Sequence, residues 1–438
     1  MEKNILRQIF FDKHNHWDHF IEKHGARIRA IVVKEVEKFH NCGNPKNGFT
    51  LLVGEGCHDI KVVPYRCKGR FCTTCSSGET EEWSRMMADD VLQVNHRHVV
   101  FTIDEGLRVI FQKHRQLLKP LMDEAVRIIQ DWFKKKLKVT AGVIAGLHTF
   151  GAQMNVNPHV HMLVSMGGMK KNGEWKGYDF IPFPMLRKQW KTVVLKLIRR
   201  NLNEEEKKKI QHLLQKAYTE NGEGFYVYAP KQKGNVKVQL AYIGRYIRRP
   251  AIALHRIEDY DGHYVTYRYY DKKDEQDKWE TISVEEFIAR LIVHIPDEQF
   301  KTIRYYGVYS RRIKSLCKKL ITVWQKEARK WIVKVKKTVT RRKWEQRIKE
   351  QTGKDPMVCT HCQNFYEYKG EVCLKDGQLE VKYASCDVAR ACLERMIYNF
   401  TGIETTKTQQ QEEEEEEVSK QEKHVDREIF SQLCLFEV

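Results

Sequence analysis

Two histidines separated by one residue, His159 and His161, have the type and spacing that most clearly predict chemistry. Side chains alternate between the two faces of a β-strand, so both imidazoles would point the same way and Val160 would point to the other side. Two imidazoles on one face can bind one divalent cation. A lone His-x-His is more often a polar strand face, and His96 and His98 form a rival pair. We prefer the later pair because a turn precedes it and an apolar run follows it.

The neighbouring segments strengthen this interpretation. Residues 142–151 are β-branched and apolar and are bounded by glycines, which predicts a strand, and the turn-like residues 153–158 would join it to the histidine strand as a hairpin. Residues 241–249 favour a short helix that ends before a proline. On that helix Tyr242 and Tyr246 would lie one turn apart on one face. Phenols beside a phosphate polarised by a metal can cleave DNA through a covalent intermediate.

The first third of the chain is rich in cysteine. Cys72 and Cys75 have the spacing of a zinc knuckle, which presents two thiolates on a tight turn. The second knuckle that usually accompanies it is incomplete, because Ile60 stands where a cysteine would follow Cys57. Cys42, His58 or Cys67 would have to supply the missing ligand. We therefore expect a structural zinc site drawn from Cys42, Cys57, Cys67, Cys72 and Cys75.

The last third combines a basic stretch, a further knuckle and an acidic tail. Residues 311–346 hold fourteen Lys or Arg and two acidic residues, which favours a helical arm that follows phosphates, with a solvated helix as the alternative. Cys359 and Cys362 form another knuckle, but the later cysteines lack matching spacing. The sequence is therefore equally compatible with the presence and with the absence of a second zinc ion. Residues 409–417 are polar and then acidic, as in a disordered tail.

Other aromatic and basic residues have weaker implications. Tyr305 and Tyr306 are rival nucleophiles, but adjacent strand residues face opposite ways, which favours packing and base stacking. Lys68 and Arg70, within the cysteine-rich stretch, fit contacts with a nucleic acid, although a solvated surface would look the same.

Composition indicates the partner. The chain has 438 residues and a formal net charge of +19, which favours a polyanion, nucleic acid before an anionic membrane. No apolar run is long enough to span a bilayer, and the first residues lack the apolar core of a signal peptide. We expect a cytoplasmic, nucleoid-associated protein. Its 12 cysteines are then metal ligands or buried thiols more often than disulfides.

Periodicity predicts an α+β protein. Helical spacing covers residues 1–40, 107–138, 183–216 and 285–292, and strands are expected at 96–103, 251–257, 264–270 and 279–282. The predicted domains are an N-terminal helical and zinc-binding domain (1–95), a nuclease domain (96–310), a basic helical arm (311–348), a small cysteine-containing module (349–405) and an acidic disordered tail (406–438).

In this order, the parts resemble the rolling-circle transposases of the two-tyrosine HUH insertion-sequence class, which are bacterial enzymes with an N-terminal zinc-binding domain. The resemblance covers about two thirds of the chain, up to Gly307. Its departure is Ile60, at the incomplete knuckle. Its motifs are CKGRFCTTC (67–75), VFTI (100–103), HTFG (148–151), NPHVH (157–161), YIGRY (242–246), HIP (294–296) and RYYG (304–307).

The resemblance implies a five-stranded antiparallel sheet that carries the histidine pair on a central strand, with the tyrosine helix against it. Magnesium or manganese would be held by the pair and a third polar side chain, Gln153 as first candidate and His148 as second. A tyrosine would attack single-stranded DNA at transposon ends, leaving a 5′-phosphotyrosine and a free 3′-hydroxyl for transfer to target DNA. Tyrosine ionises near pH ~10, so help is expected from the metal and from Arg245, Arg248 and Arg249.

Two other functions remain open. A plasmid or phage replication initiator, or a relaxase, uses the same chemistry, although the zinc domain and the HIP and RYYG motifs favour a transposase. A non-catalytic zinc protein that binds nucleic acid would need none of the catalytic positions, and all of them are present.

Overall fold

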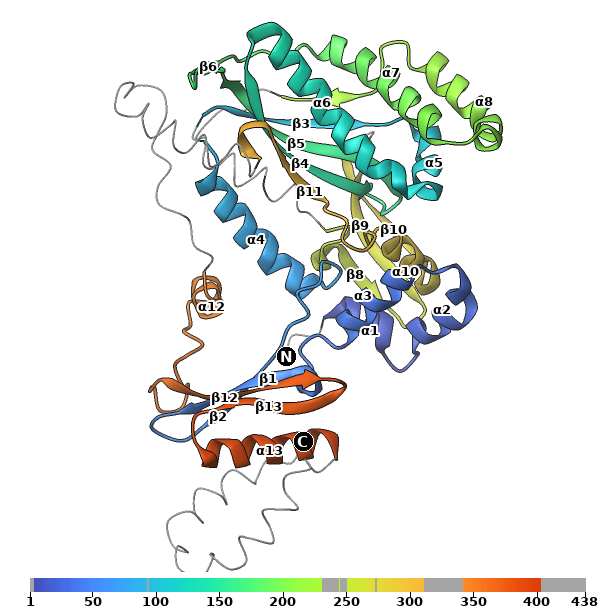
Figure 1. Ribbon diagram of the computed structural model, residues 1–438. Helices are drawn as coiled ribbons and strands as arrows, with labels where there is room; N and C mark the ends of the chain where they lie inside the picture. The colour runs from blue at the N-terminus through green and yellow to red at the C-terminus, as the bar shows by residue number, and fades with distance from the viewer. Residues whose placement is uncertain are drawn as a thin grey trace, which may run out of the picture. The chain divides into compact units, whose positions relative to one another are not determined.

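A computed structural model describes residues 4–92, 94–230, 244, 250–271, 274–310 and 342–402. The chain forms two compact units, and neither is continuous in sequence. One unit comprises Met1–Val36 and Thr73–Arg341, and the other comprises Glu37–Cys72 and Arg342–Val438. Figure 1 shows the elements of each unit by label.

The first unit is built around an antiparallel sheet with the strand order β11-β4-β5-β3-β7, and β6 pairs with β5 beside this path. The predicted hairpin is present as β4 and β5, and β5 is the central strand. This confirms the α+β class and the central position of the histidine pair. The strands are β3 (His96–Thr102), β4 (Thr140–Phe150), β5 (Val156–Met169), β6 (Trp175–Gly177), β7 (Val227–Tyr228) and β11 (Ile303–Tyr306).

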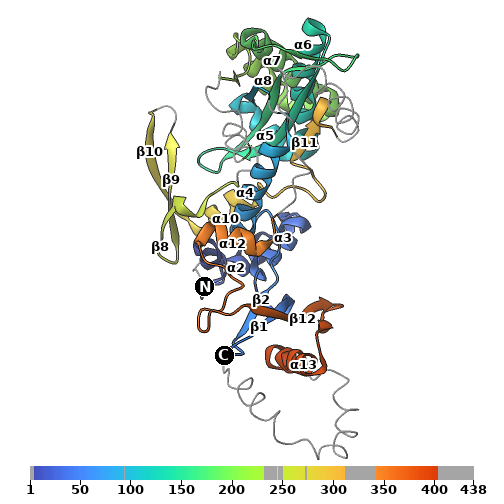
Figure 2. The same cartoon turned by 90° about the vertical axis from the view of Figure 1, so that its left-hand side faces the viewer.

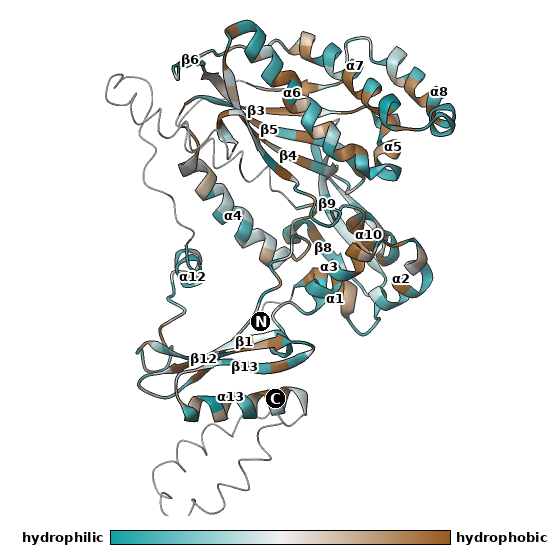
Figure 3. Cartoon of the chain, in the orientation of Figure 1, coloured by the Kyte–Doolittle hydropathy of each residue, from teal (hydrophilic) through white to brown (hydrophobic). Residues whose placement is uncertain are grey.

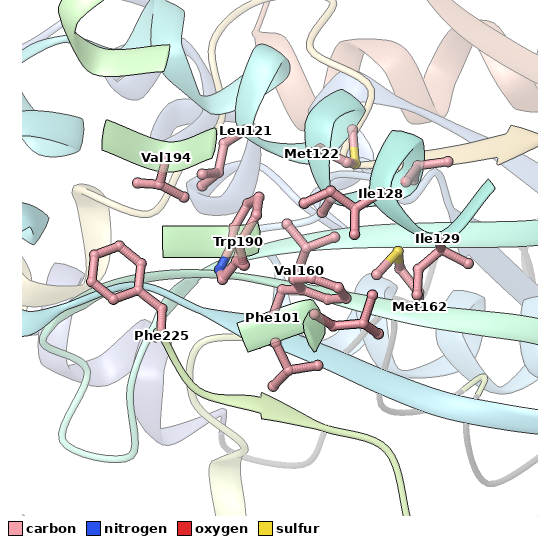
Figure 4. Packing of buried hydrophobic residues seen from close by; sticks show 14 of the residues in the cluster. Phe101, Leu121, Met122, Ile128, Ile129, Val160, Met162, Trp190, Val194 and Phe225 are labelled. Carbon is pink, nitrogen blue, oxygen red and sulfur yellow. The ribbon is translucent and has the colours of Figure 1, made fainter. Parts of the chain in front are cut away.

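Helices α6 (Leu118–Leu137) and α7 (Phe183–Asn201) cover one face of this sheet (Figure 1). Apolar residues recur on α6 at helical spacing, so one stripe faces the strands. Phe101 and Val160 point to this side and pack with Trp190 of α7 (Figure 4). The indole Nε1–H of Trp190 donates to the carbonyl of Thr102 at 2.7 Å, which satisfies its polar atom inside the core.

Helix α4 (Thr73–Asp90) contributes to a second, smaller core. Its Met87 packs with Ile144 of β4 and Leu163 of β5, which point away from the α6 side. Hydrophobic residues, brown in Figure 3, therefore run along β3, β4 and β5, whereas α8 (Glu204–Glu220) is largely hydrophilic on its outer side. The sheet thus has apolar packing on both faces, and its polar side chains are exceptions.

The same unit contains further helices and a three-stranded sheet, whose long β9–β10 hairpin stands out in Figure 2. The predicted turn at Asp261 and Gly262 joins β8 to β9, with Gly262 at φ +100°. The prediction of a strand at 251–257 is wrong. A 3-10 turn occupies 254–256, because a short apolar run does not by itself specify a strand. The elements are α1 (Ile5–Phe11), α2 (His16–His24), α3 (Ala30–His40), α5 (Arg108–Lys113), β8 (Ile257–Tyr260), β9 (Tyr264–Asp271), β10 (Gln276–Ser283) and α10 (Val284–Ile292). The boundary between the two units falls within α3, after Val36.

The second unit is a four-stranded antiparallel sheet of order β13-β12-β1-β2 with helix α13 packed on it. Phe49 of β1 lies opposite Val372 of β12, so the cysteine-rich segment and the C-terminal module share one sheet. The domains predicted at 1–95 and 349–405 are therefore not separate here, because sequence order does not show pairing between distant strands. The elements are β1 (Gly48–Gly54), β2 (Ile60–Pro64), α12 (Trp344–Thr352), β12 (Tyr366–Lys375), β13 (Gln378–Ala384) and α13 (Asp387–Thr401).

Within the described residues, no helix is both long enough and apolar enough to cross a bilayer. The basic stretch 311–341 and the acidic tail lie outside the described residues.

Candidate metal centres

Three histidines converge on one face of the central sheet. One nitrogen from each of His148, His159 and His161 lies within 4.8 Å of those of the other two. His148 of β4 stands directly opposite His159 of β5, and His161 lies two residues further along β5 on the same face. The hairpin thus brings a third imidazole to the predicted pair.

Hydrogen bonds fix the orientation of the β5 histidines. The Nδ1–H of His159 donates to the carbonyl of Asn157 at 2.7 Å, so that its Nε2 carries the lone pair that a cation needs. Nδ1 of His161 is joined to Nε2 of His98 at 2.8 Å. Bonds of this kind are the usual means by which a protein orients imidazole ligands.

His98 and His96, the rival pair, have different positions. Both are buried on β3. Burial, and then the nearby His159, lower the pKa of His98 to about 4, so His98 supports His161 as a neutral imidazole. His96 instead bonds to the hydroxyl of Tyr309 at 2.6 Å and to the carbonyl of Val94 at 2.7 Å. Burial lowers its pKa to about 4, and it is a core histidine.

The third position of the histidine group is occupied by His148, the second candidate from the sequence. Gln153 is the first candidate from the sequence. Its backbone carbonyl accepts hydrogen bonds from the hydroxyl of Tyr267 at 3.3 Å and from the guanidinium of Arg290 at 3.4 Å. These bonds fix the turn that precedes β5.

The donor set fits a divalent cation. His148 and His161 are buried, and imidazole is the commonest side-chain ligand for such ions. Asn157 lies two residues before His159, next to a bulge in the pairing of β4 with β5. Its Oδ1 is buried and has no hydrogen-bond partner in the described parts of the chain. The sequence alone does not reveal this buried oxygen beside the start of the histidine strand.

The predicted tyrosine segment lies almost entirely outside the described residues, which include only Gly244. Gly244 is helical and buried, and a Cβ atom there would lie 2.5 Å from Met87 Cε and 2.8 Å from Ser84 Oγ. Glycine therefore permits close contact with α4, whose Met87 packs against the histidine-bearing side of the sheet. The predicted residues outside the described ranges are Tyr242, Arg245, Tyr246, Arg248 and Arg249.

The rival tyrosines lie on β11 and face opposite ways, as predicted. Tyr306 donates to the carboxylate of Asp123 at 2.6 Å, and burial, together with this bond, raises the pKa of its hydroxyl. Tyr305 accepts a bond from the indole N–H of Trp83 at 3.1 Å. Both side chains have structural contacts, and the raised pKa makes Tyr306 a poor nucleophile.

Seven of the described cysteines form two groups. The sulfurs of Cys42, Cys67, Cys72 and Cys75 lie within 4.8 Å of one another, which fits a four-thiolate zinc site. The backbone N–H of Cys67 donates to Cys42 Sγ at 3.5 Å, and that of Gly69 donates to Cys67 Sγ at 3.3 Å. Between these ligands, Lys68 and Arg70 are exposed.

Cys57, which the sequence analysis placed with these four residues, lies in the second group with Cys359 and Cys362. Local spacing could not reveal this, because its partners are about three hundred residues away. The backbone N–H of Cys362 lowers the pKa of the Cys359 thiol to about 7.

Two family profiles match the two parts of the chain that carry these groups. A profile described as "Putative transposase" matches residues 142–317, and one described as "Transposase zinc-binding domain" matches residues 12–103. The first range contains the three histidines, and the second contains the four-cysteine group. The two profiles thus identify a transposase with a zinc-binding domain toward the N-terminus. The chain belongs to this transposase family, and its zinc-binding domain supports a structural zinc ion.

Curated relatives agree. The transposase for insertion sequence element IS801 from Pseudomonas savastanoi pv. phaseolicola is 27% identical over 311 residues, which cover 68% of this chain and 74% of that protein. A Sinorhizobium fredii (strain NBRC 101917 / NGR234) protein described as "Putative transposase y4qJ" is 26% identical over 331 residues, 70% of this chain and 80% of that protein. No solved structure matches the chain.

Proposed function

We propose that this transposase cleaves and rejoins single-stranded DNA at transposon ends through a 5′-phosphotyrosine intermediate, as in rolling-circle transposition. The convergence of His148, His159 and His161 on the central strands is the observation that carries the proposal. The name of the IS801 relative, a transposase for an insertion sequence element, supports transposition over replication initiation or conjugative relaxation. The intact histidine group argues against a non-catalytic zinc protein.

In this proposal the histidine group would hold the cation that polarises the scissile phosphate. A divalent cation bound there, magnesium or manganese, supplies a Lewis acid for the phosphate. His159 and His161 would hold the cation through Nε2, because their Nδ1 atoms bond to the carbonyl of Asn157 and to His98. His148 is the third ligand that we propose, and Gln153 is the alternative, which a comparison of the two alanine variants would distinguish.

Tyr242 and Tyr246 are the proposed nucleophiles. One phenolate oxygen attacks the phosphorus in line, forming a phosphotyrosine bond as the bond to the 3′-oxygen of the leaving strand breaks and a 3′-hydroxyl forms. The reverse reaction, with a new 3′-hydroxyl, joins strands without ATP because one phosphodiester replaces another. Arg245, Arg248 and Arg249 offset the developing charge. The close contact of Gly244 with α4 supports a position of this helix beside the histidine face.

The remaining assignments follow from this chemistry. Single-stranded transposon ends and target DNA are the proposed partners, bound through the exposed Lys68 and Arg70 and the basic arm at 311–348. The proposed nuclease domain spans 96–310. DNA substrates would place the protein at the bacterial nucleoid.

Incubation of the protein with labelled single-stranded transposon ends and Mn²⁺ tests this proposal. We expect a covalent protein–DNA adduct that is lost in His159→Ala and His161→Ala, while DNA binding persists through phosphate contacts elsewhere. His212→Ala, on the exposed side of α8, is the matched control. Full cleavage by the double histidine variant would refute the proposal.

A further inference from the structure

The second cysteine group joins two distant segments of the second unit. Cys57 lies between β1 and β2, and Cys359 and Cys362 lie in the turn that precedes β12. The three sulfurs lie within 4.8 Å of one another, and Cys57 Sγ is 3.6 Å from Cys359 Sγ. We propose that Cys57, Cys359 and Cys362 bind a second structural zinc ion, with the Asp59 carboxylate as fourth ligand.

The sulfur spacing fits a metal and not a disulfide. Bonded sulfurs are about 2.05 Å apart, far closer than the 3.6 Å between Cys57 and Cys359. Zinc–thiolate bonds of about 2.3 Å in a tetrahedron separate two sulfurs by about 3.8 Å. The observed separation of 3.6 Å is close to the one expected for two thiolates on a shared zinc ion.

The backbone around the second group repeats a feature of the first. The N–H of His361 donates to Cys359 Sγ at 3.4 Å, just as the N–H of Gly69 donates to Cys67 Sγ at 3.3 Å. In both cases the amide two residues after a cysteine points at its sulfur. Such bonds stabilise the thiolate, which is the form that binds zinc.

Gly56 allows the two segments to approach. A Cβ atom at this position would lie 2.2 Å from Asn364 Nδ2 and 3.3 Å from Cys362 Sγ. A side chain at this position would have to displace the Asn364 amide and would crowd Cys362 Sγ. Glycine at this position therefore leaves room for the knuckle beside Cys57.

Asp59 is the proposed fourth ligand, but its carboxylate stands outside the group that the three sulfurs form within 4.8 Å, so it has to turn toward the ion to bind. Its Oδ2 lies 3.8 Å from Cys359 Sγ and accepts a hydrogen bond from the hydroxyl of Tyr366. A carboxylate oxygen is an ordinary zinc ligand at about 2.0–2.2 Å. Three thiolates and one carboxylate fill four positions, which makes this a closed, structural site.

The ion would hold together the sheet of the second unit. β1 already pairs with β12, and the metal would join the same two segments at the Cys57 end of β1. Because the ligands are about three hundred residues apart, the bound ion would restrict the unfolded chain strongly. This inference is independent of the proposed strand cleavage.

Zinc content of the full-length protein, measured by inductively coupled plasma mass spectrometry, tests the inference. We expect two zinc ions per chain in the wild-type protein and one in the Cys359→Ser/Cys362→Ser variant. In Asp59→Ala, one of the two ions should be retained more weakly. The matched control Cys373→Ser/Cys386→Ser changes two cysteines outside both groups and should keep two ions. One zinc ion in the wild-type protein, or two in the knuckle variant, would overturn the inference, and unaltered retention in Asp59→Ala would overturn the assignment of Asp59.

A measurement on the unaltered protein covers the case in which the variants do not fold. Alkylation with iodoacetamide, followed by peptide mapping, should show Cys57, Cys359 and Cys362 protected together and labelled together after chelation. Exposed Cys386 should be labelled throughout. Labelling of the three cysteines before chelation would contradict a bound metal.

Discussion

At the scale of single residues, the histidine group depends on support that the sequence motif does not contain. The His-x-His spacing predicts a role for His159 and His161, whereas by the same spacing His98 belongs to a rival pair with His96. In the structure His98 is bonded to His161 and His148 faces His159. Sequence could not assign these roles, because they depend on which strands pair and in what register. The rival pair therefore contains one supporting residue and one core residue.

His98→Ala should weaken metal binding without removing a ligand. Loss of a residue that orients an imidazole ligand typically costs about 10–100-fold in metal affinity. We expect the Mn²⁺ concentration for half-maximal cleavage to rise by about that factor, with partial rescue at high Mn²⁺ and in His98→Gln. An unchanged Mn²⁺ dependence would show that the bond between His98 and His161 has no role in metal binding.

Stability should fall as the pH is lowered from 6.5 toward 4. The folded-state pKa of His96 is about 4, below its ordinary value of 6.5, so the unfolded chain takes up a proton first and is favoured in this range. At about 1.4 kcal/mol per pH unit, the cost for His96 alone approaches about 3 kcal/mol by pH 4. Urea unfolding between pH 7.5 and 4.5 measures this slope, which should be shallower in His96→Gln. A stability that does not fall across this range would contradict a neutral, buried His96.

At the scale of secondary-structure elements, periodic segments were predicted well. Helix α6 and the β4–β5 hairpin are where their apolar spacing indicated, because each buries one regular face. The strands β1, β2, β12 and β13 were not predicted. Their apolar residues become buried only when strands that are distant in the sequence pair, as Phe49 of β1 does with Val372 of β12. Short strands whose partner is distant leave no local signal.

The contact between Gly244 and α4 yields an element-scale prediction. Alanine normally stabilises a helix by about 1 kcal/mol relative to glycine. Here Gly244→Ala should instead destabilise the protein by about 1–3 kcal/mol, because the added methyl group meets Met87 and Ser84. Met87→Ala combined with Gly244→Ala should recover part of the loss. Urea unfolding of both single variants and the double variant gives the coupling energy, and purely additive effects would rule out the contact.

At the scale of the whole molecule, the two compact units cut across the predicted order of domains. The second unit takes its strands from both ends of the described chain, and its second cysteine group does the same. The zinc prediction from Cys72 and Cys75 was local and could be made from spacing. The assignment of Cys57 could not, because its partners belong to the C-terminal module.

The net charge of +19 predicts DNA binding that depends strongly on salt. Each phosphate neutralised by Lys or Arg releases condensed counterions, so affinity falls steeply with salt. We expect affinity for single-stranded DNA to drop at least about tenfold between 50 and 200 mM NaCl. Fluorescence anisotropy with a labelled oligonucleotide measures this dependence. A flat response would argue against a phosphate-binding role for the basic residues.

The central claim is that a tyrosine beside the histidine group carries the cleaved strand. Mass spectrometry of the peptide cross-linked to a single-stranded transposon end in Mn²⁺ tests it most directly. The account predicts an adduct on Tyr242 or Tyr246, none in the Tyr242→Phe/Tyr246→Phe variant, and cleavage by at least one single variant. An adduct found only on Tyr305 or Tyr306, or an undiminished adduct in the double variant, would contradict it.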